Sequence, residues 1–266
     1  MRPFLSGRVV LVTGASQGLG AATARVMARA GAVVIATARD AAALDLVVRG
    51  IRDEGAKALA IAADVSDEAA TEALVSETLN ATGRIDSLIN IAGSAETIGQ
   101  KLWETPPETW QRLCATNITG ALNLVRHIVP PMQAQHYGRM LFLSSPATFS
   151  PQPDTGAYAA TKAAVNQMVQ TLALELNGTG ITVNAFNPGP IDTPLFGQVS
   201  ETLGRNAPSA MMTSVARPPE LAARLLLWLN APETEGLTGE FVQWNNPNTL
   251  DAMDHFLRAY HIGKTS

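Results

Sequence analysis

The 266-residue sequence has one cysteine, few aromatic residues and little charge. Cys114 has no second cysteine to pair with, which excludes an internal disulfide, and the histidines have no metal-ligand spacing with it or with each other. No run of about 18 apolar residues occurs, so a transmembrane helix is excluded on length. The net charge of −4 gives no reason to expect nucleic acid or an anionic membrane as a partner.

Apolar residues make up 46% of the chain and charged residues 16%, proportions typical of a globular protein rather than a disordered one. The length suits one α/β domain or two small ones, and we expect a single domain over 1–266. Residues 1–7 show no signal-peptide pattern. We therefore expect a cytoplasmic protein.

Short β-branched segments alternate with longer helical patterns, which predicts parallel strands joined by crossover helices. Strands are expected at 9–13, 33–37, 58–62, 86–90, 139–144, 182–186 and 240–244. Helices are expected near 18–30, 41–54, 67–82, 108–133, 158–177 and 218–230. The first strand is apolar throughout, which indicates a sheet covered on both faces. The predicted fold is α/β: one Rossmann-like, doubly wound parallel sheet of about seven strands with helices on both faces.

Three irregular segments, 94–107, 146–157 and 188–217, follow the carboxyl ends of strands, where open parallel sheets bind their ligands. We interpret 188–217 as a substrate lid, although ordinary helix packing explains its apolar residues equally well. Those residues are Leu195, Phe196, Val199, Leu203, Met211 and Met212. Residues 245–266 are expected to form an atypical C-terminal tail.

The first predicted strand ends in a glycine-rich turn, Thr13-Gly14-Ala15-Ser16-Gln17-Gly18-Leu19-Gly20, and a helix begins at its last glycines. Glycine lets the backbone turn tightly and approach a pyrophosphate without a Cβ in the way. The helix N-terminus adds free N–H groups and the positive end of the helix dipole. A tight turn of this kind can also bind nothing, but its place after the first strand favours a dinucleotide phosphate site.

The end of the second strand should lie beside an adenine ribose, where an acidic residue suits NAD and an arginine suits the 2′-phosphate of NADP. The sequence has Ala38 in the acidic position and Arg39 next, and guanidinium pairs well with phosphate. This favours NADP(H) over NAD(H); the alternative is that Arg39 is a solvated surface charge, paired with Asp40. Asp64 and Val65 are placed to flank the adenine ring, and Asp64 could equally be a turn residue.

Tyr158 and Lys162 lie one turn apart on one face of a predicted helix, so their side chains can converge. A neighbouring ammonium favours phenolate and lowers a phenol pKa from about 10 by roughly one to three units, which makes it a usable acid or base. Ser145, 13 residues before Tyr158, is placed to bond a carbonyl oxygen, and Asn117 is a polar amide in the middle of a predicted helix. The structural alternatives are that Ser145 caps or turns the chain and that Asn117 satisfies a buried carbonyl.

Taken in order, these motifs resemble the short-chain dehydrogenase/reductase family over nearly the whole chain, from Val9 to about Val242. The ordered set is Thr13-Gly14-x-x-x-Gly18-x-Gly20, Asp64-Val65, Asn90-Ile91-Ala92-Gly93, Asn117, Ser145, Tyr158-x-x-x-Lys162 and Pro188-Gly189-Pro190-Ile191-x-Thr193. Within the family, the sequence resembles the ketoacyl-reductase-like, NADP-preferring members. The resemblance implies reversible hydride transfer between NADP(H) and a carbonyl or secondary alcohol.

The resemblance also implies a role for each catalytic residue. Tyr158 would be the general acid in reduction and the base in oxidation, and Lys162 would bind the nicotinamide ribose and lower the pKa of Tyr158. Ser145 would polarise the substrate oxygen. Asn117 would hold a helix bend and a water for proton relay.

For the cofactor, the resemblance implies that Ile191 and Thr193 hold the nicotinamide carboxamide and that Asn90 fixes the central strand. The full set expected to bind it is Gly14, Ser16, Gln17, Gly18, Leu19, Gly20, Arg39, Asp64, Val65, Asn90, Ala92, Gly93, Tyr158, Lys162, Pro188, Gly189, Ile191 and Thr193. No metal is expected. The only other partner expected besides a small-molecule substrate is a second copy of the chain, in a homodimer or homotetramer through the helices at 108–133 and 158–177.

The sequence departs from the family pattern at three places. Ile91 stands where a second Asn is common. Gln17 stands where many NADP-preferring members carry a basic residue, so NADP preference depends on Arg39 with help from Ser16. The segment Val242-Gln243-Trp244-Asn245-Asn246 replaces the usual Val-Asp-Gly-Gly, which puts in doubt the family's tetramer contact and the place of the tail near the substrate.

Two other functions are compatible with parts of this sequence. A cofactor-binding regulator or interaction protein without catalysis could use the same fold, but Tyr158, Lys162 and Ser145 are all present. A sugar-nucleotide epimerase or dehydratase shares the Tyr–Lys pair but resembles a longer chain with a differently spaced glycine turn. The oxidoreductase is therefore the leading hypothesis.

Overall fold

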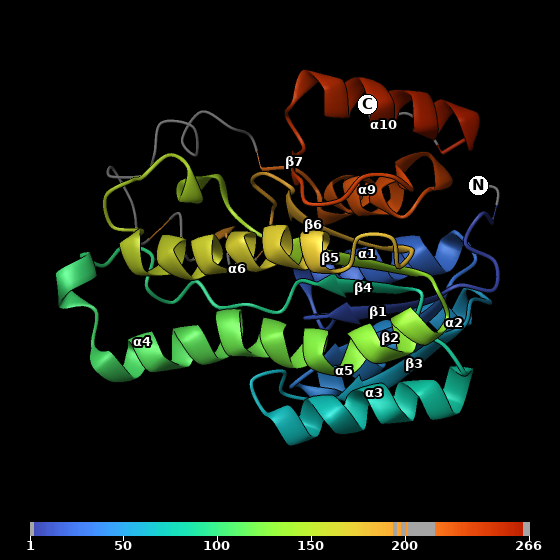
Figure 1. Ribbon diagram of the computed structural model, residues 1–266, viewed down its shortest axis with the longest axis horizontal. Helices are drawn as coiled ribbons and strands as arrows, with labels where there is room; N and C mark the ends of the chain where they lie inside the picture. Colours follow the sequence, from blue (N-terminus) through green and yellow to red (C-terminus); the bar gives the residue numbers. More distant parts are fainter. Residues whose placement is uncertain (1–2, 194–195, 198–200, 202–215, 263–266) are drawn as a thin grey trace.

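The computed structural model describes residues 3–193, 196, 197, 201 and 216–262. Within them, seven strands form one parallel sheet in the order β3-β2-β1-β4-β5-β6-β7 (Figure 1). The strands are β1 Val9–Thr13, β2 Val33–Ala38, β3 Ala58–Ala62, β4 Ser87–Asn90, β5 Gly138–Leu143, β6 Ile181–Asn187 and β7 Phe241–Gln243. The expected α/β sheet is thus confirmed. Its strand order reverses between β1 and β4, the point where such sheets bind ligands.

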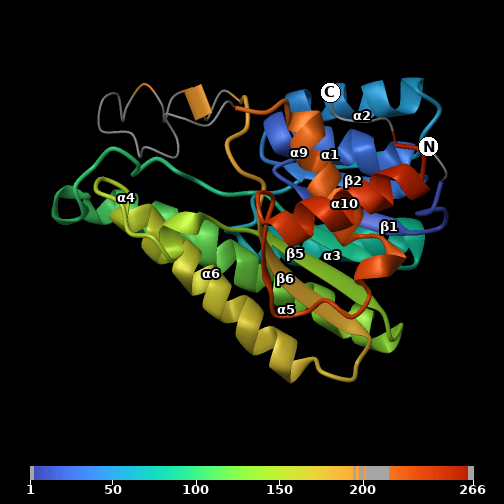
Figure 2. The ribbon, with the colours of Figure 1, turned by 90° about the horizontal axis from the view of Figure 1, so that it is seen from above.

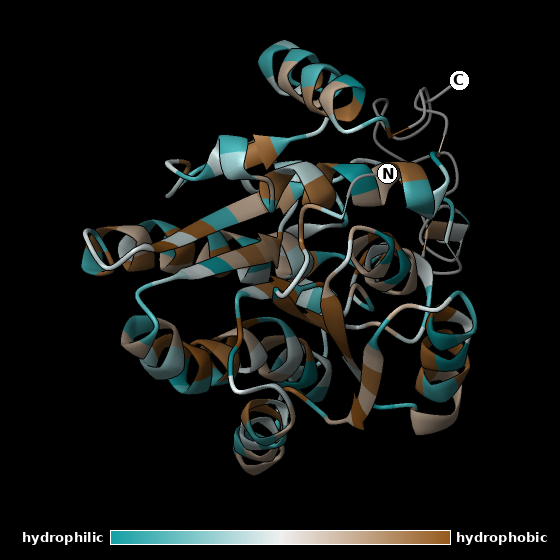
Figure 3. Cartoon of the chain, turned by 90° about the vertical axis from the view of Figure 1, so that its right-hand side faces the viewer, coloured by the Kyte–Doolittle hydropathy of each residue, from teal (hydrophilic) through white to brown (hydrophobic). Residues whose placement is uncertain are grey.

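Helices cover both faces of this sheet. The core on one face includes side chains of α1 (Gly18–Arg29), α2 (Ala41–Asp53) and α9 (Pro219–Leu229). The core on the other face includes side chains of α3 (Glu68–Thr82), α5 (Gly120–Ala134) and α6 (Gly156–Glu175). Because strand side chains alternate, Val10 and Val12 enter the first core and Val9 and Leu11 the second. Figure 3 shows the resulting hydrophobic strands between the helices.

The helix expected over 108–133 is not uniform. It consists of α4 (Pro107–Cys114), a π-helical turn η2 (Ala115–Thr119) and α5. The turn is wider than an α-helical one, and such turns are frequent at functional sites. Periodicity alone does not reveal it, since here it accompanies tertiary hydrogen bonds of the buried Asn117.

The C-terminal tail contains a helix that the sequence analysis did not predict, α10 (Pro247–Ala259). The Asn246 side chain accepts a hydrogen bond from Asn248 N and caps its start. Met253, Phe256 and Leu257 are buried in the same core as α9. α10 therefore lies over α9, away from the sheet (Figures 1 and 2).

The ends of the expected lid segment lie together, because Ile191 and Arg217 form an isolated parallel bridge. Leu195, Val199, Leu203, Met211 and Met212 lie outside the described residues. Three short 3₁₀ helices complete the loops described: η1 (Leu102–Glu104), η3 (Pro146–Thr148) and η5 (Pro232–Thr234). Among the helices that the structure describes, none combines the length and apolar character needed to cross a bilayer.

Candidate active site

A cleft of about 880 Å³ runs along the carboxyl edge of the sheet. Residues at or just after the carboxyl ends of the strands form its walls, across the sheet from β3 to β7. Ala63, Ala38, Asn187 and Trp244 are examples. All of the expected catalytic and cofactor residues line this cleft except Asn90 and Asn117. Groups that are far apart in the sequence therefore meet in one site.

The glycine-rich turn forms one end of the cleft, where α1 begins. Gln17, the N-cap of α1, makes no side-chain capping bond, so within the part of the chain that the structure describes its side chain leaves the first N–H groups of the helix open. The tightness of the turn requires glycine: a Cβ on Gly20 would stand 2.0 Å from Gly14 O, and Gly14 has a φ of +66°. The turn thus presents open N–H donors and a helix N-terminus to the cleft, an arrangement suited to a pyrophosphate.

Asn90 lies behind this turn rather than in the cleft. The Thr13 hydroxyl donates to Asn90 Oδ1 at 2.6 Å and accepts hydrogen bonds from Ile91 N and Ala92 N at 3.1 and 3.0 Å. These bonds tie β1 to the loop after β4. Asn90 therefore supports the cleft wall from the sheet.

Two acidic residues, Asp40 after β2 and Asp64 after β3, have structural partners. Asp40 caps α2 by accepting a hydrogen bond from Ala43 N at 3.0 Å. Asp64 Oδ1 accepts from Ser66 N and from the Ser66 hydroxyl, as its turn-residue alternative requires. Burial acts to raise the pKa of Asp64, but the Ser66 hydrogen bonds and the positive charge of Arg39 outweigh it and lower that pKa. Arg39 itself is exposed and lines the cleft.

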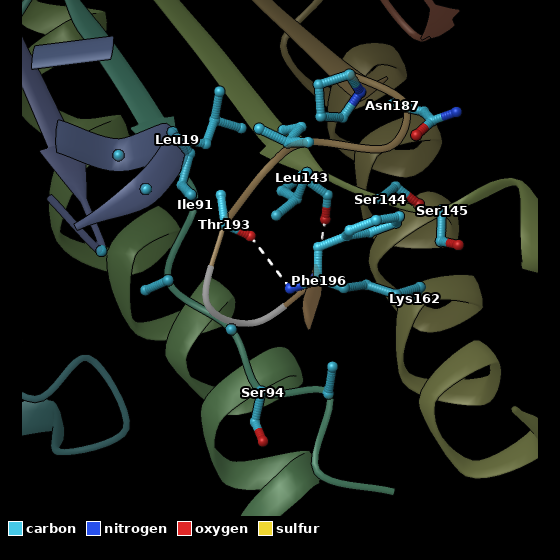
Figure 4. A pocket seen from close by; sticks show the side chains of 18 of the residues that line it. Leu19, Ile91, Ser94, Leu143, Ser144, Ser145, Lys162, Asn187, Thr193 and Phe196 are labelled. Carbon is cyan, nitrogen blue, oxygen red and sulfur yellow. Dashed lines mark hydrogen bonds between the residues drawn. The ribbon is translucent and has the colours of Figure 1, made fainter. Parts of the chain in front are cut away.

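Tyr158, Lys162 and Ser145 meet on the opposite side of the cleft. Tyr158 lies in the first turn of α6, and Lys162, only 3% exposed, donates from Nζ to Leu143 O at 3.0 Å. The Nζ atom lies 5.8 Å from the centre of the Tyr158 ring. Figure 4 shows Ser145 and Lys162 on one side, with Leu19 and Ile91 across from them.

Ser145 has two roles in this geometry. Its Oγ accepts a hydrogen bond from Ala147 N at 3.3 Å and caps η3, as the structural alternative proposed. It is also a hydrogen-bond partner of Tyr158. Capping therefore holds the Ser145 hydroxyl close to the phenol.

The ionisation of the Tyr–Lys pair follows from burial. Burial raises the pKa of Tyr158 to about 12, although the hydrogen bond with Ser145 acts to lower it. Burial also lowers the pKa of Lys162 to about 8. The pKa of Tyr158 is thus raised rather than lowered as expected, because removal from water penalises the phenolate more than its neighbours stabilise it. At neutral pH the phenol is protonated and the ammonium mostly charged.

Asn117 acts from behind the cleft. Its side chain is buried, with Nδ2 donating to Ser94 O and Thr161 Oγ1 and Oδ1 accepting from Ser94 N. A Cβ on Gly93 would stand 3.2 Å from Asn117 Oδ1 and 3.4 Å from Lys162 Nζ. The amide thus satisfies the Ser94 carbonyl, as the alternative proposed, and joins the loop after β4 to α6.

The turn after β6 forms the remaining wall. Gly189 has a φ of +77°, and Thr193 Oγ1 accepts a hydrogen bond from Phe196 N at 3.2 Å (Figure 4). Several cleft residues were not predicted individually: Ser94, Ile98, Ser150, Gln152, Trp244 and Asn245. Most lie in the irregular segments after strands, so segment position indicated the region without identifying the side chains.

Comparison with known proteins shows the family and the fold of the chain. The family model described as short chain dehydrogenase matches residues 8–204. A 3-oxoacyl-[acyl-carrier-protein] reductase of Thermotoga maritima is 33% identical over 238 residues, which cover 90% of this chain and 96% of that protein. A short chain dehydrogenase of Pseudocercospora fijiensis is 35% identical over 192 residues, 72% of this chain but only 62% of the length of that relative. The crystal structure of a 3-oxoacyl-[acyl-carrier protein] reductase from Brucella melitensis with bound NAD has a TM-score of 0.78, with 32% identity and 91% of each chain covered.

Proposed function

The chain belongs to the short-chain dehydrogenase family of oxidoreductases, and from that premise we propose that it transfers hydride between NADP(H) and a carbonyl or secondary alcohol, with Tyr158 moving the proton. The observation that carries this proposal is the meeting of Tyr158, Lys162 and Ser145 in the cleft that also contains the glycine-rich turn. Lys162 is held by the carbonyl of Leu143 at the end of β5, and Ser145 by the N–H of Ala147. A regulator without catalysis would not need this arrangement.

The cleft fits a nicotinamide dinucleotide at both ends. At one end are the free N–H groups of α1 and the glycines that let the backbone approach closely. At the other is the buried ammonium of Lys162, which has three donors and, among the described residues, one hydrogen-bond acceptor, Leu143 O. The other donors suit ribose hydroxyls, and Ile191 and Thr193 would hold the carboxamide. The cofactor, when bound, supplies or accepts the hydride.

The proton steps belong to the residues of this chain. In reduction, the protonated Tyr158 hydroxyl donates to the substrate oxygen while Ser145 bonds the same oxygen. A pKa near 12 keeps the phenol protonated at neutral pH, which suits this direction. In oxidation the phenol must first lose its proton, and the charge of Lys162 favours that loss. Asn117 contributes by holding the loop and helix that carry these groups.

Preference for NADP(H) is supported by the end of β2. Asp40 is the first carboxylate there, but it is used to cap α2, while Arg39 is exposed on the cleft wall. A guanidinium in that position can form a charged, bidentate hydrogen bond with a 2′-phosphate. A neutral 2′-hydroxyl gives no such ion pair. The Brucella relative, solved with NAD, makes NADH the proper comparison in any assay.

We further propose that two copies of the chain associate through α4, α5 and α6. Large apolar side chains on these helices are exposed: Trp110, Leu122 and Leu174, the last by 79%. Exposed apolar side chains that recur on neighbouring helices are typical of an interface.

The Tyr158→Phe variant tests the proposed reaction. We expect turnover of a reducible carbonyl to fall at least about 100-fold, since the proton donor is lost. Binding of NADP⁺, measured by calorimetry, should stay within a few-fold because the ring remains. Turnover close to that of the wild type would overturn the proposal.

A further inference from the structure

Trp244 lies directly against the turn after β6, although the sequence analysis gave it no role. Its backbone N–H donates to Asn187 O at 3.1 Å, which places it beside the end of β6. Its indole covers Gly189 so closely that a Cβ there would stand 1.9 Å from the indole nitrogen. Trp244 also lines the cleft. The side chain therefore fills the space that glycine leaves at this turn.

Arg217 holds the same turn and also contacts the indole of Trp244. Its guanidinium carbon lies 3.7 Å from the centre of the Trp244 ring, a cation–π distance. The guanidinium also donates to Pro188 O. Its backbone N–H donates to Pro190 O at 3.1 Å, and its carbonyl accepts from Asp192 N at 2.9 Å. Arg217 thus forms hydrogen bonds with three residues of the five-residue stretch 188–192.

The partial burial of Arg217 strengthens the contact of its guanidinium with the Trp244 ring. Arg217 is half-buried, and burial lowers the pKa of its guanidinium to about 10, which leaves it fully charged at neutral pH. Its Nε is buried and has no hydrogen-bond partner among the described residues. A cation that has lost water on one side gains more from an aromatic face than an exposed cation does. The ring is therefore a main source of compensation for this charge.

We propose that Trp244 and Arg217 form a clamp that fixes the Pro188–Asp192 turn in the shape needed to hold the nicotinamide end of the cofactor. Both are positioning residues: they act through the turn. The inference rests on the proposed function, because it assigns the nicotinamide to this turn. The clamp joins three parts of the chain: the end of β6, the residue Trp244 just after β7, and Arg217 at the end of segment 188–217.

The experiment compares two ligands by calorimetry: NADP⁺ and 2′-phospho-ADP-ribose, which lacks only the nicotinamide ring. In Trp244→Ala and Arg217→Ala we expect the Kd for NADP⁺ to rise roughly tenfold, while the Kd for the fragment changes less than about twofold. Trp103→Ala, in which an 80% exposed ring is removed from η1, is the matched control and should change neither. Equal losses for both ligands, or no loss for either, would overturn the clamp.

Conservative variants keep the test valid if an alanine variant fails to fold. Trp244→Phe retains an aromatic face and should recover most of the NADP⁺ affinity, whereas Arg217→Lys loses the planar, forked guanidinium and should not. The double alanine variant should lose little more than either single one, because both remove the same contact. Additive losses would contradict the pairing.

Failure of the proposed function would look different. If the wild type binds NADP⁺ and the Tyr158→Phe variant keeps the wild-type turnover, the proton role of Tyr158 is overturned. The clamp is unaffected by that result. If the wild type prefers NAD⁺, the same comparison is made with NAD⁺ and ADP-ribose. Absence of binding of both dinucleotides overturns both proposals.

Discussion

The ammonium of Lys162 donates a hydrogen bond to the carbonyl oxygen of Leu143 at 3.0 Å and so joins α6 to the end of β5. This bond holds a buried positive charge in the wall of the cleft, and burial lowers its pKa to about 8. A lysine with a lowered pKa in the folded state destabilises that state at lower pH. Retaining such a group is typical of a functional site rather than of a structural one.

Replacement of Lys162 by Met should stabilise the ligand-free protein at pH 7, by about 1–3 kcal/mol, because the apolar stem remains and the buried charge is removed. The unfolded chain holds this proton up to a pKa near 10.5 and the folded chain only to about 8. The contribution of Lys162 to wild-type stability should therefore rise between pH 8 and 10.5, and the variant should lack that rise. Urea unfolding across this pH range measures it; parallel curves would contradict the burial argument. Cofactor binding should be lost in the variant.

The Ser145→Ala variant should shift the pH profile of alcohol oxidation to higher pH. The pKa of Tyr158 is about 12, so the phenolate fraction, and with it the oxidation rate, should rise about tenfold per pH unit across the neutral range. The hydrogen bond from Ser145 lowers that pKa, and its removal raises it further. The measurement is kcat/KM as a function of pH, for alcohol oxidation and for carbonyl reduction, in the wild type and the variant. Equal oxidation rates of the wild type and the variant at each pH would exclude Ser145 as a partner of the phenol.

The Asp86→Asn variant should lose about 2–3 kcal/mol of stability at pH 7, because the buried carboxylate accepts hydrogen bonds from Arg8, Arg84 and Val9 N. The loss is smaller than for a fully buried ion pair, since both arginines are partly exposed. Burial acts to raise the pKa of Asp86, but hydrogen bonds from Arg84, Val9 and Arg8 outweigh it and lower it. Its stabilisation is therefore present above the unfolded pKa and is lost as the pH falls through the folded one.

Chemical denaturation of wild type and Asp86→Asn between pH 3 and 7, a range chosen around the ordinary carboxyl pKa of about 4, tests this claim. The difference between the two proteins should shrink as the solution becomes acidic. Asp53→Asn, at an exposed position near the end of α2, is the control and should change stability by less than about 0.5 kcal/mol. A constant difference across the range would contradict the assigned role of the carboxylate.

The Arg39→Ala variant should raise the KM for NADPH by roughly 10- to 100-fold and leave the KM for NADH within about twofold. The reason is that the guanidinium can pair with the 2′-phosphate that only NADPH carries. Arg49→Ala, which removes an exposed charge from α2, is the matched control and should affect neither. Equal changes in KM for NADPH and NADH would overturn the assignment of Arg39 to the 2′-phosphate.

The Leu174→Glu variant should dissociate the proposed oligomer, because it places a charge on the exposed face of α6. Light scattering after size-exclusion chromatography gives the mass of each species. Leu46→Glu, at a 64% exposed position on α2, should leave the mass unchanged. A monomeric wild type would rule the association out.

Local patterns predicted much of the fold. β1 and β3 have the predicted bounds, and the glycine-rich turn and the start of α1 are as expected. These features depend on residues close together in the chain. The sequence did not predict α10, because it is stabilised by tertiary packing. Its apolar residues Met253, Phe256 and Leu257 are buried in the same core as α9. The π-helical turn at Asn117 was missed for a similar reason, since its amide partners are distant in the sequence.

The sequence by itself determined the family, the order of the motifs and the spacing of Tyr158 and Lys162, because these are properties of the chain as written. Only the tertiary structure decided that burial raises the Tyr158 pKa, that Asp40 caps a helix and that Trp244 stacks on Arg217. Those outcomes depend on which groups lose water and which distant segments meet, and neither quantity is encoded in local spacing.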